Sequence, residues 1–216
     1  MRSAVQRRTP KAEARAESQR ERILDAAQKC FIEHGFHGAG MALIAETAGI
    51  STGLTYRYFD SKHAIMLAII ARELEGKRER IQELCVRHDF LGAVMEKFVA
   101  WQAGSLDLMN AAIFLEMSAE ASRSPEILEA IRKSDAKVLE EFEDWLQMDR
   151  RAGGLGLPAG EARKRGLLMQ CIIEGLVVRA ARDPSLDPKA LRRALEPVFR
   201  HQGFLPPLTS PSVDPA

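Results

Sequence analysis

Residues 41–62 constrain the fold more than any other stretch, because they encode two short helices separated by a glycine turn. The apolar residues of the first segment recur at helical spacing and share one face: Met41, Ile44, Ala45 and Ala48. Gly49 predicts the end of this helix, since glycine adopts the left-handed conformation that a helix C-terminus prefers. Ser51 is placed to cap a second helix from about Thr52 to Tyr58. This layout predicts a helix-turn-helix motif, whose second helix enters the major groove of DNA.

The second helix is more polar than is usual for a helix of a folded domain. Leu54 within it and Phe59 directly after it are its only purely apolar residues. Its tyrosine hydroxyls and its guanidinium group can donate hydrogen bonds to phosphates. Gly53 carries no side chain, which allows the backbone to approach a groove wall. Ser61 is placed to cap the following helix, and Lys62 lies in its first turn, where its charge opposes the helix dipole and indicates an external anion. The alternative is a small helical subdomain with a polar rim.

A set of residues at fixed spacing carries a family resemblance: Ile44-Ala45, Ala48-Gly49-Ile50-Ser51, Gly53, Tyr56-Arg57-Tyr58-Phe59 and Ser61-Lys62, with Ile23, Ala26, Ala27, Phe31 and Gly35-Phe36 upstream. Over roughly residues 18–70, this set resembles the DNA-binding signature of TetR-family transcriptional regulators. The resemblance implies an all-α protein, in which an N-terminal three-helix helix-turn-helix domain is joined to a C-terminal helical domain for ligand binding and dimerisation.

The resemblance also implies which residues face DNA: Thr52, Gly53, Leu54, Tyr56, Arg57, Tyr58 and Lys62. Among these we assign Tyr56, Tyr58 and Lys62 to phosphates, and Thr52 and Arg57 to base edges.

Four positions depart from the family pattern. Gly40 stands where the family usually has a capping Thr or Ser, and Ala42 stands where a polar or basic reader can occur. Leu54-Thr55 inverts the usual order of a small polar and an apolar residue, which leaves Leu54 to contact a thymine methyl group.

Helix-forming residues dominate the rest of the chain and predict an all-α fold, while the 46% apolar content provides for a core. We predict four regions: a disordered basic arm at 1–17, a helix-turn-helix domain at 18–62, a helical ligand-binding and dimerisation domain at 63–203, and a disordered tail at 204–216. The first helix is expected from Ser18 or Gln19 to Gly35, and a connecting helix from Ser61 to about Leu84. Residues 1–62 carry ten Lys and Arg against seven Asp and Glu, which fits DNA at this end.

Methionine and aromatic residues gather in residues 95–117, together with two glutamates. Such side chains adapt to irregular shapes and can line a cavity for a small-molecule effector, although plain core packing explains them as well. The candidate ligand-binding residues are Met95, Phe98, Trp101, Met109, Ile113, Phe114, Glu116, Met117 and Glu120. The two glutamates would suit a cationic ligand, or would simply face solvent or an arginine.

In TetR-like proteins the last two long helices of the body pair with those of a second subunit. By resemblance these are 126–151 and 161–182 here, where Leu168, Cys171, Gly175 and Ala180 provide small and apolar contacts. A two-fold dimer would place its recognition helices roughly 34–36 Å apart and read a palindromic operator in double-stranded DNA.

Other classes of function find little support in the sequence. There is no nucleotide-binding glycine loop, no metalloprotease motif and no nucleophile elbow, so we expect no enzyme, no cofactor and no metal site. No apolar run reaches the length of a membrane span and no secretory signal begins the chain, so we expect a cytoplasmic protein without a membrane partner. The cysteines Cys30, Cys85 and Cys171 lie far apart at apolar helical positions, which predicts buried thiols.

Together these features predict a ligand-responsive repressor that binds its operator as a homodimer and is released by a small molecule. Alternatives are a transcriptional activator, an architectural DNA-binding protein, and a small-molecule-binding helical protein without DNA affinity.

Overall fold

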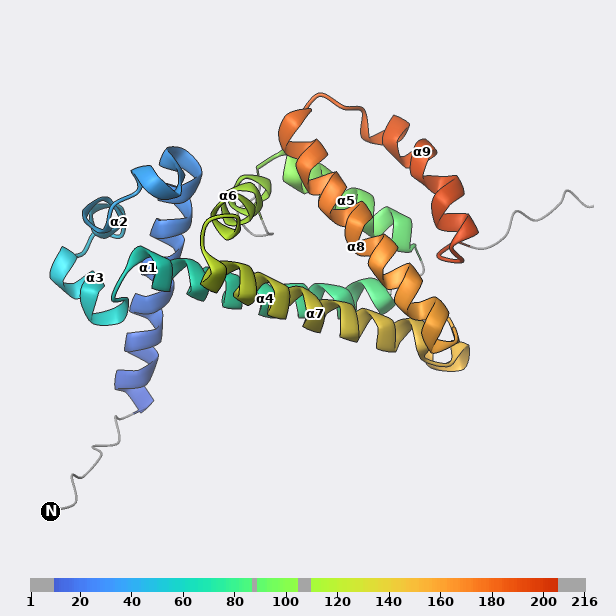
Figure 1. The fold of residues 1–216 in the computed structure, drawn as a ribbon, viewed down its shortest axis with the longest axis horizontal. Coiled ribbons are helices and arrows are strands. Elements are labelled where there is room, and N and C mark those ends of the chain that lie inside the picture. Colours follow the sequence, from blue (N-terminus) through green and yellow to red (C-terminus); the bar gives the residue numbers. More distant parts are fainter. Residues whose placement is uncertain (1–9, 87–88, 105–109, 206–216) are drawn as a thin grey trace, which may run out of the picture. The chain divides into compact units, whose positions relative to one another are not determined.

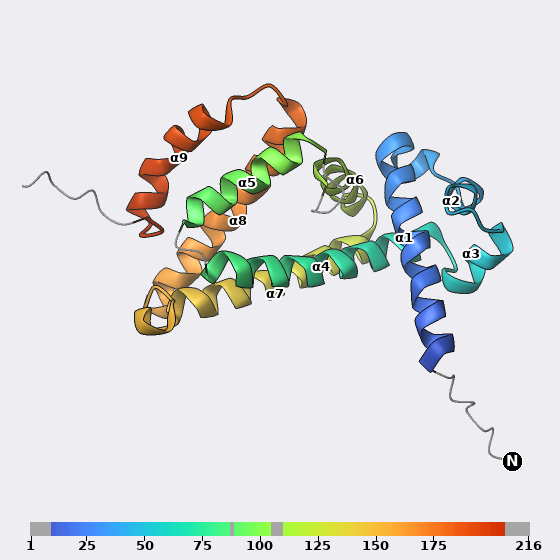
Figure 2. The ribbon, with the colours of Figure 1, turned by 180° about the vertical axis from the view of Figure 1, so that it is seen from behind.

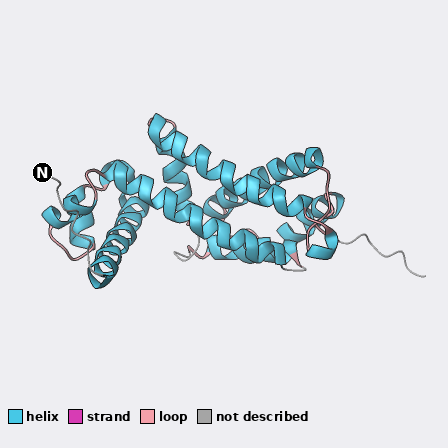
Figure 3. Cartoon of the chain, turned by 90° about the horizontal axis from the view of Figure 1, so that it is seen from below, coloured by secondary structure: helices cyan, strands magenta, loops and turns pink. Residues whose placement is uncertain are grey.

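The computed structural model describes residues 10–86, 89–104 and 110–205, without the side chains of Pro10 and of residues 77–86. The described residues form helices and no strand, which confirms the all-α prediction (Figure 3). In chain order the helices are α1 (Pro10–Gly38), α2 (Met41–Thr47), α3 (Thr52–Tyr58), α4 (Lys62–Val86), α5 (Phe90–Gln102), α6 (Ala111–Ala121), α7 (Pro125–Gln147), the 3₁₀ turn η1 (Arg150–Ala152), α8 (Ala159–Arg182) and α9 (Pro188–His201).

The chain divides into two compact units. The N-terminal unit comprises Met1–Arg72 and Glu116–Ile131, and the C-terminal unit comprises Glu73–Leu115 and Arg132–Ala216. Helices α4, α6 and α7 therefore each contribute residues to both units.

In the N-terminal unit, α2 and α3 lie beside α1 (Figures 1 and 2). Four apolar residues on the inner side of α1 are buried: Ile23, Ala27, Cys30 and Phe31. The first turns of α4 also bury their apolar residues: Ile65, Met66, Ile69 and Ile70. This burial explains why the unit extends to Arg72, beyond the predicted domain boundary at residue 62.

Helix α1 differs from its prediction at the N-terminus. It begins at Pro10 rather than at Ser18 or Gln19, so the part of the predicted disordered arm that the structure describes is helical. Proline is favourable in the first turn of a helix, and the alanines, glutamates and cations that follow are strong helix formers. They extend a helix that is already held by its buried turns. Residues 1–9 lie outside the described residues.

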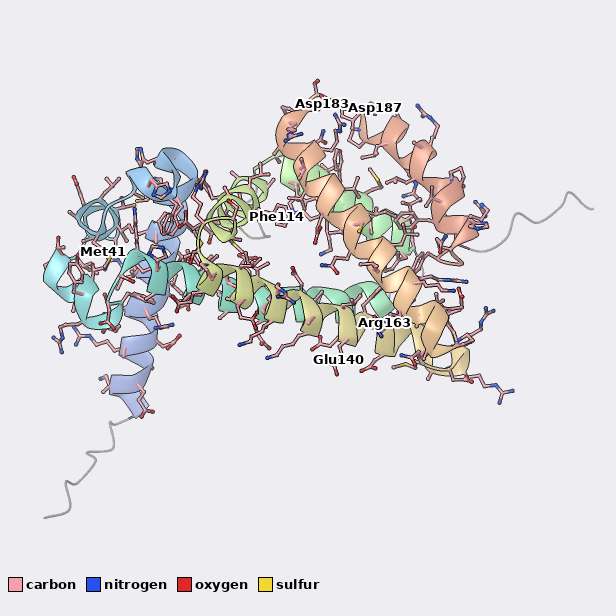
Figure 4. All side chains as sticks on the ribbon, viewed as in Figure 1. Met41, Phe114, Glu140, Arg163, Asp183 and Asp187 are labelled. Carbon is pink, nitrogen blue, oxygen red and sulfur yellow. The ribbon has the colours of Figure 1, made fainter. Side chains whose placement is uncertain are left out.

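The C-terminal unit is built around α5, which packs against α8 and α9. An aspartate caps the start of both α5 and α9: the Asp89 carboxylate accepts from the Gly92 N–H at 2.8 Å, and the Asp187 carboxylate accepts from the Lys189 N–H at 2.9 Å. Gln102 Nε2 donates to the carbonyls of the loop that joins α8 to α9, a loop bracketed in Figure 4 by the labelled residues Asp183 and Asp187.

An aromatic cluster fills one part of this core: Phe90, Phe142, Trp145, Phe199 and Phe204. Phe204 is buried and its ring centroid lies 5.0 Å from that of Phe90. The prediction of a disordered tail from residue 204 is therefore wrong at its first residue, since an aromatic ring next to an apolar core is stabilised by burial. Residues 206–216 lie outside the described residues.

Candidate nucleic-acid interface

The turn between α2 and α3 follows from two residues. Gly49 adopts a left-handed conformation with φ 63°, and the N–H groups of Gly49 and Ile50 donate to carbonyls of the last turn of α2 at 2.9 and 3.0 Å. The Ser51 hydroxyl then accepts from the Leu54 N–H at 3.2 Å and caps α3. Both features agree with their sequence prediction. Gly40 begins α2 with no side-chain cap, as its lack of a side chain requires.

Helix α3 has a buried face and an outer face. Thr55 and Phe59 are buried, and the Thr55 hydroxyl donates to the Ser51 carbonyl at 3.4 Å. Tyr56 is 50% exposed, and Arg57 is exposed beside it. Hence Thr55, rather than Leu54, is the fully buried residue of the inverted Leu54-Thr55 pair.

Gly53 lies on the outer face, and a Cβ added there would have no atom within 4 Å. Internal packing therefore does not require glycine at this position. The remaining candidates of α3, Thr52, Leu54 and Tyr58, are partly exposed at its edges. The sequence-predicted DNA-facing residues of α3 thus share one short helix whose accessible surface is mainly polar, and their contacts with DNA stay predictions.

Lys62 makes intramolecular contacts. Its Nζ donates to the Phe36 carbonyl at 2.7 Å and to the His37 carbonyl at 3.2 Å, and it lies 4.7 Å from the centre of the Phe36 ring. The ammonium therefore supplies donors to the last carbonyls of α1, where the helix dipole favours a cation. Sequence reasoning could not find these partners, because they precede Lys62 by more than twenty residues.

Two arginines of α1 support the motif from outside. The Arg20 guanidinium lies 4.6 Å from the centre of the Phe59 ring, a cation–π distance. Arg22 Nη2 lies 3.5 Å from the Gly49 carbonyl. Arg20 therefore supports the residue directly after α3, and Arg22 supports the turn before α3.

Arg72 of α4 holds α4 to α1 through a fork of hydrogen bonds. Nη1 donates to the carboxylates of Glu21 and Asp25 at 3.0 and 2.6 Å, and Nη2 donates to Gln28 Oε1 at 2.6 Å. Burial alone would lower the pKa of Arg72, but the hydrogen bonds and charges of Glu21 and Asp25 outweigh it and raise the pKa above its ordinary value. The fork therefore holds the N-terminal half of α4 against α1.

Two glutamates of α6, Glu116 and Glu120, contact residues of α1 and α4 within the N-terminal unit. Gly35 interrupts α1 with φ 69°, and the N–H of the next residue, Phe36, donates to Glu116 Oε2 at 2.9 Å. Glu120, one turn further along α6, faces His37 and His63. Sequence reasoning placed both glutamates among the ligand candidates and missed these contacts, since nothing local in the sequence connects α6 with the end of α1.

The nine ligand candidates accordingly fall into different units. Met95, Phe98 and Trp101 are buried in the core of the C-terminal unit, and the buried Ile113 and the partly buried Phe114 also belong to that unit. Glu116, Met117 and Glu120 belong to the N-terminal unit, and Met109 lies outside the described residues. The two carboxylates have partners within the N-terminal unit, and the binding of a ligand by these residues stays a prediction.

The outer face of α8 carries apolar residues at helical spacing. Leu167 is 56% exposed, Leu168 is also exposed, and Cys171 follows one turn later. Gly175 continues the face, with no atom within 4 Å of an added Cβ. The prediction of a buried thiol is therefore wrong for Cys171 within this chain, whereas Cys30 is buried. The side chain of Cys85 lies outside the described residues.

Within the described ranges, no cluster of three His, Cys, Asp or Glu side chains could hold a metal ion. None of the helices described is both long and apolar enough to cross a membrane.

Known proteins resemble this chain in sequence and in fold. The profile described as "Bacterial regulatory proteins, tetR family" matches residues 23–69, which include α2, α3 and most of α1. The HTH-type transcriptional regulator UidR of Escherichia coli is 31% identical over 125 residues, which make up 58% of this chain and 63% of UidR. The match therefore spans less than two thirds of that relative. The HTH-type transcriptional repressor Rv1474c of Mycobacterium tuberculosis is 24% identical over 83% of this chain and 90% of its own length.

Solved structures share the fold over most of the chain. GusR of Salmonella enterica aligns with a TM-score of 0.66 and 24% identity, covering 85% of this chain and 96% of GusR. A transcriptional regulator from Saccharomonospora viridis, solved in complex with choline, aligns with a TM-score of 0.64 and 18% identity, covering 86% of this chain and 97% of that one. The helix-turn-helix region at residues 23–69 is thus that of the tetR family of bacterial regulatory proteins, and the relatives that the chain resembles are HTH-type transcriptional regulators.

Proposed function

We propose that this protein is a transcriptional repressor that binds a palindromic operator as a homodimer and releases it when a small molecule binds. The observation that carries the proposal is the outer face of α3. It presents Tyr56, Arg57 and an unobstructed Gly53 on a helix whose geometry is fixed by the Ser51 cap and the Gly49 turn. A short polar helix with hydroxyl and guanidinium donors suits a groove lined by phosphates.

The first experiment selects bound fragments from fragmented genomic DNA and then measures binding of the selected site by gel shift at several salt concentrations. We expect affinity that falls as salt rises, because phosphate contacts release counterions. No selected site, or equal affinity for selected and scrambled DNA, would contradict the proposal. That result would favour a helical ligand-binding protein without DNA affinity.

The direction of regulation needs its own test, because a relative of 33% identity over 86 residues, FasR of Mycolicibacterium smegmatis, is named an activator. A selected site that overlaps a promoter, with higher transcription in the deletion strain, supports repression. Lower transcription in that strain would support activation instead.

The homodimer is supported by the outer face of α8. Exposed leucines beside Cys171 and Gly175 form an apolar stripe on which a second copy could pack closely. We expect the variant Leu167→Glu to sediment as a monomer and to lose operator affinity. Val198→Glu is the matched control, because Val198 is also an exposed apolar residue of the C-terminal unit, on α9. A dimeric Leu167→Glu protein would exclude this face as the dimer interface.

The effector site is proposed in the core of the C-terminal unit, around α5. The buried indole N–H of Trp101 has no hydrogen-bond acceptor among the described residues. A buried donor without a partner is costly, and an acceptor atom of a bound molecule would satisfy it. The choline complex of the structural neighbour supports a small-molecule site in this fold.

Trp101 also offers a reporter for this site. The chain contains two tryptophans, and the other, Trp145, donates to the Gly153 carbonyl at 3.0 Å. In a Trp145→Phe protein, a compound that releases the operator should change the fluorescence of Trp101. Trp101→Phe keeps an aromatic side chain but loses the N–H donor, so it should bind that compound more weakly. Release of the operator with unchanged affinity in Trp101→Phe would place the effector elsewhere.

A further inference from the structure

The N-terminal turns of α1 carry a row of cations on one side. Lys11, Arg15 and Arg22 follow one another at spacings of four and seven residues, so they share one face of the helix. All three are exposed, and all three precede residue 23, where the match to the family profile begins. Glu13 and Glu17 lie on the opposite side, because each follows a cation by two residues, which is more than half a helical turn. The charges of these first turns are therefore separated by sign around the helix.

The free protein gains no stability from this row. Lys11 and Arg15 are four residues apart, and like charges at this spacing destabilise a helix slightly. Neither forms an ion pair with another residue in the described part of the chain. Further along α1, by contrast, Lys29 Nζ lies 4.0 Å from the carboxylate of Glu33, four residues later. A row of exposed cations without such partners favours an anion from outside the chain.

The row leads to the turn that precedes α3. Arg22 Nη2 lies 3.5 Å from the carbonyl of Gly49, which belongs to this turn. A guanidinium carries five N–H donors, so the other donors of Arg22 remain for a further acceptor. Lys11 and Arg15 continue the same face of α1 over eleven residues, or about 16 Å. The first turns of α1 extend past α3 (Figures 1 and 2), so the row runs outward from one end of the candidate interface.

We propose that Lys11, Arg15 and Arg22 bind phosphates of double-stranded DNA beside each half of the operator. This inference rests on the proposed function, because it assigns an additional contact surface to the same DNA-binding unit. Each strand of the duplex carries one phosphate per about 3.4 Å of its axis, so a row of about 16 Å spans about five base pairs. Lysine and arginine contacts with phosphates carry no sequence information. The row therefore lengthens the bound DNA and adds affinity for every sequence alike.

The test compares the wild type with the double variant Lys11→Gln/Arg15→Gln in gel shifts at several salt concentrations. Each phosphate contact contributes about one to the slope of log affinity against log salt, so the slope of the variant should be lower by about two. Its preferred operator sequence should be that of the wild type. Its unfolding midpoint should not fall, because both side chains are exposed and form no ion pair in the described part of the chain.

Lys189→Gln/Arg193→Gln is the matched control. These two residues are also a lysine and an arginine four positions apart, and both are exposed, on α9 of the C-terminal unit. The control removes the same net charge and should keep the wild-type slope. A control that lowers the slope as much as Lys11→Gln/Arg15→Gln does would show that net charge sets the slope, and would overturn the proposal.

The length of the operator duplex localises the contact. The wild type should bind a duplex with about five additional base pairs on each side more tightly than the operator alone, whereas Lys11→Gln/Arg15→Gln should bind the two duplexes alike. An unchanged slope in the double variant, or equal affinity of the wild type for both duplexes, would refute the row as a DNA contact. The wild type would still bind its operator in that case, so the proposed function would stand. A wild type that binds no selected DNA would refute both.

Discussion

The most direct test of the interface is to replace Gly53 with alanine. In the free protein an added Cβ would meet no atom within 4 Å, so the change costs nothing in packing. Alanine is favoured over glycine in a helix by about 0.5–1 kcal/mol. For a chain of this length, we therefore expect the unfolding midpoint to rise by about 1–4 °C. In the absence of DNA, Gly53→Ala should therefore be more stable than the wild type.

The effect on DNA binding should have the opposite sign. Where the start of α3 lies close to a groove wall, the added methyl group overlaps DNA atoms, and overpacking of a close contact costs about 1–3 kcal/mol. This corresponds to a loss of operator affinity of about 5-fold to 150-fold. Gel shift on a selected operator measures the affinity, and thermal unfolding measures the stability. Higher stability combined with weaker binding would show that glycine is retained for contact with DNA.

Gly160 provides a matched control for this experiment. It is the second residue of α8, as Gly53 is the second residue of α3, and its added Cβ also has no atom within 4 Å. Gly160→Ala should raise the midpoint by a similar amount and leave operator affinity unchanged. Wild-type affinity in Gly53→Ala would refute the close approach of α3 to DNA.

Four further variants of the N-terminal unit test the same interface. Tyr56→Phe removes one exposed hydroxyl and should weaken binding to all DNA sequences alike, whereas Thr52→Val should change the preferred operator sequence in a selection experiment. Arg72→Lys keeps the charge but cannot reproduce the fork, so we expect a loss of about 1–2 kcal/mol in the free energy of unfolding by urea; an unchanged midpoint would show that solvent compensates the fork. Lys62→Met should lower both stability and operator affinity, measured by thermal unfolding and gel shift.

The helix-turn-helix could be predicted from the sequence because its determinants are local. The Gly49 turn, the Ser51 cap and the bounds of α3 depend on residues within a few positions of one another, and the structure agrees with each of them. The caps Asp89 and Asp187 were predictable for the same reason. Such signals act before any tertiary contact forms.

Features that depend on distant partners could not be predicted. The sequence around Arg72 offers acceptors on its own helix, yet its partners lie on α1, more than forty residues away. Glu116 and Glu120 stand among methionines and aromatics, and this local composition predicts a ligand site. Their actual neighbours come from the ends of α1 and α4, which only the folded unit brings together.

The sequence indicated that the Lys62 ammonium has a partner, and the structure shows a different partner from the predicted anion. Its position in the first turn of α4 is unfavourable with respect to that helix's own dipole, which indicated a nearby partner for the ammonium. The structure supplies the carbonyls of Phe36 and His37 at the end of α1, where the local dipole favours a cation. Salt dependence separates this positioning role from the predicted phosphate contact. Loss of a phosphate contact lowers the slope of log affinity against log salt by about one. Loss of a positioning residue instead weakens binding with the slope unchanged, because the phosphate contacts of the bound state remain the same in number.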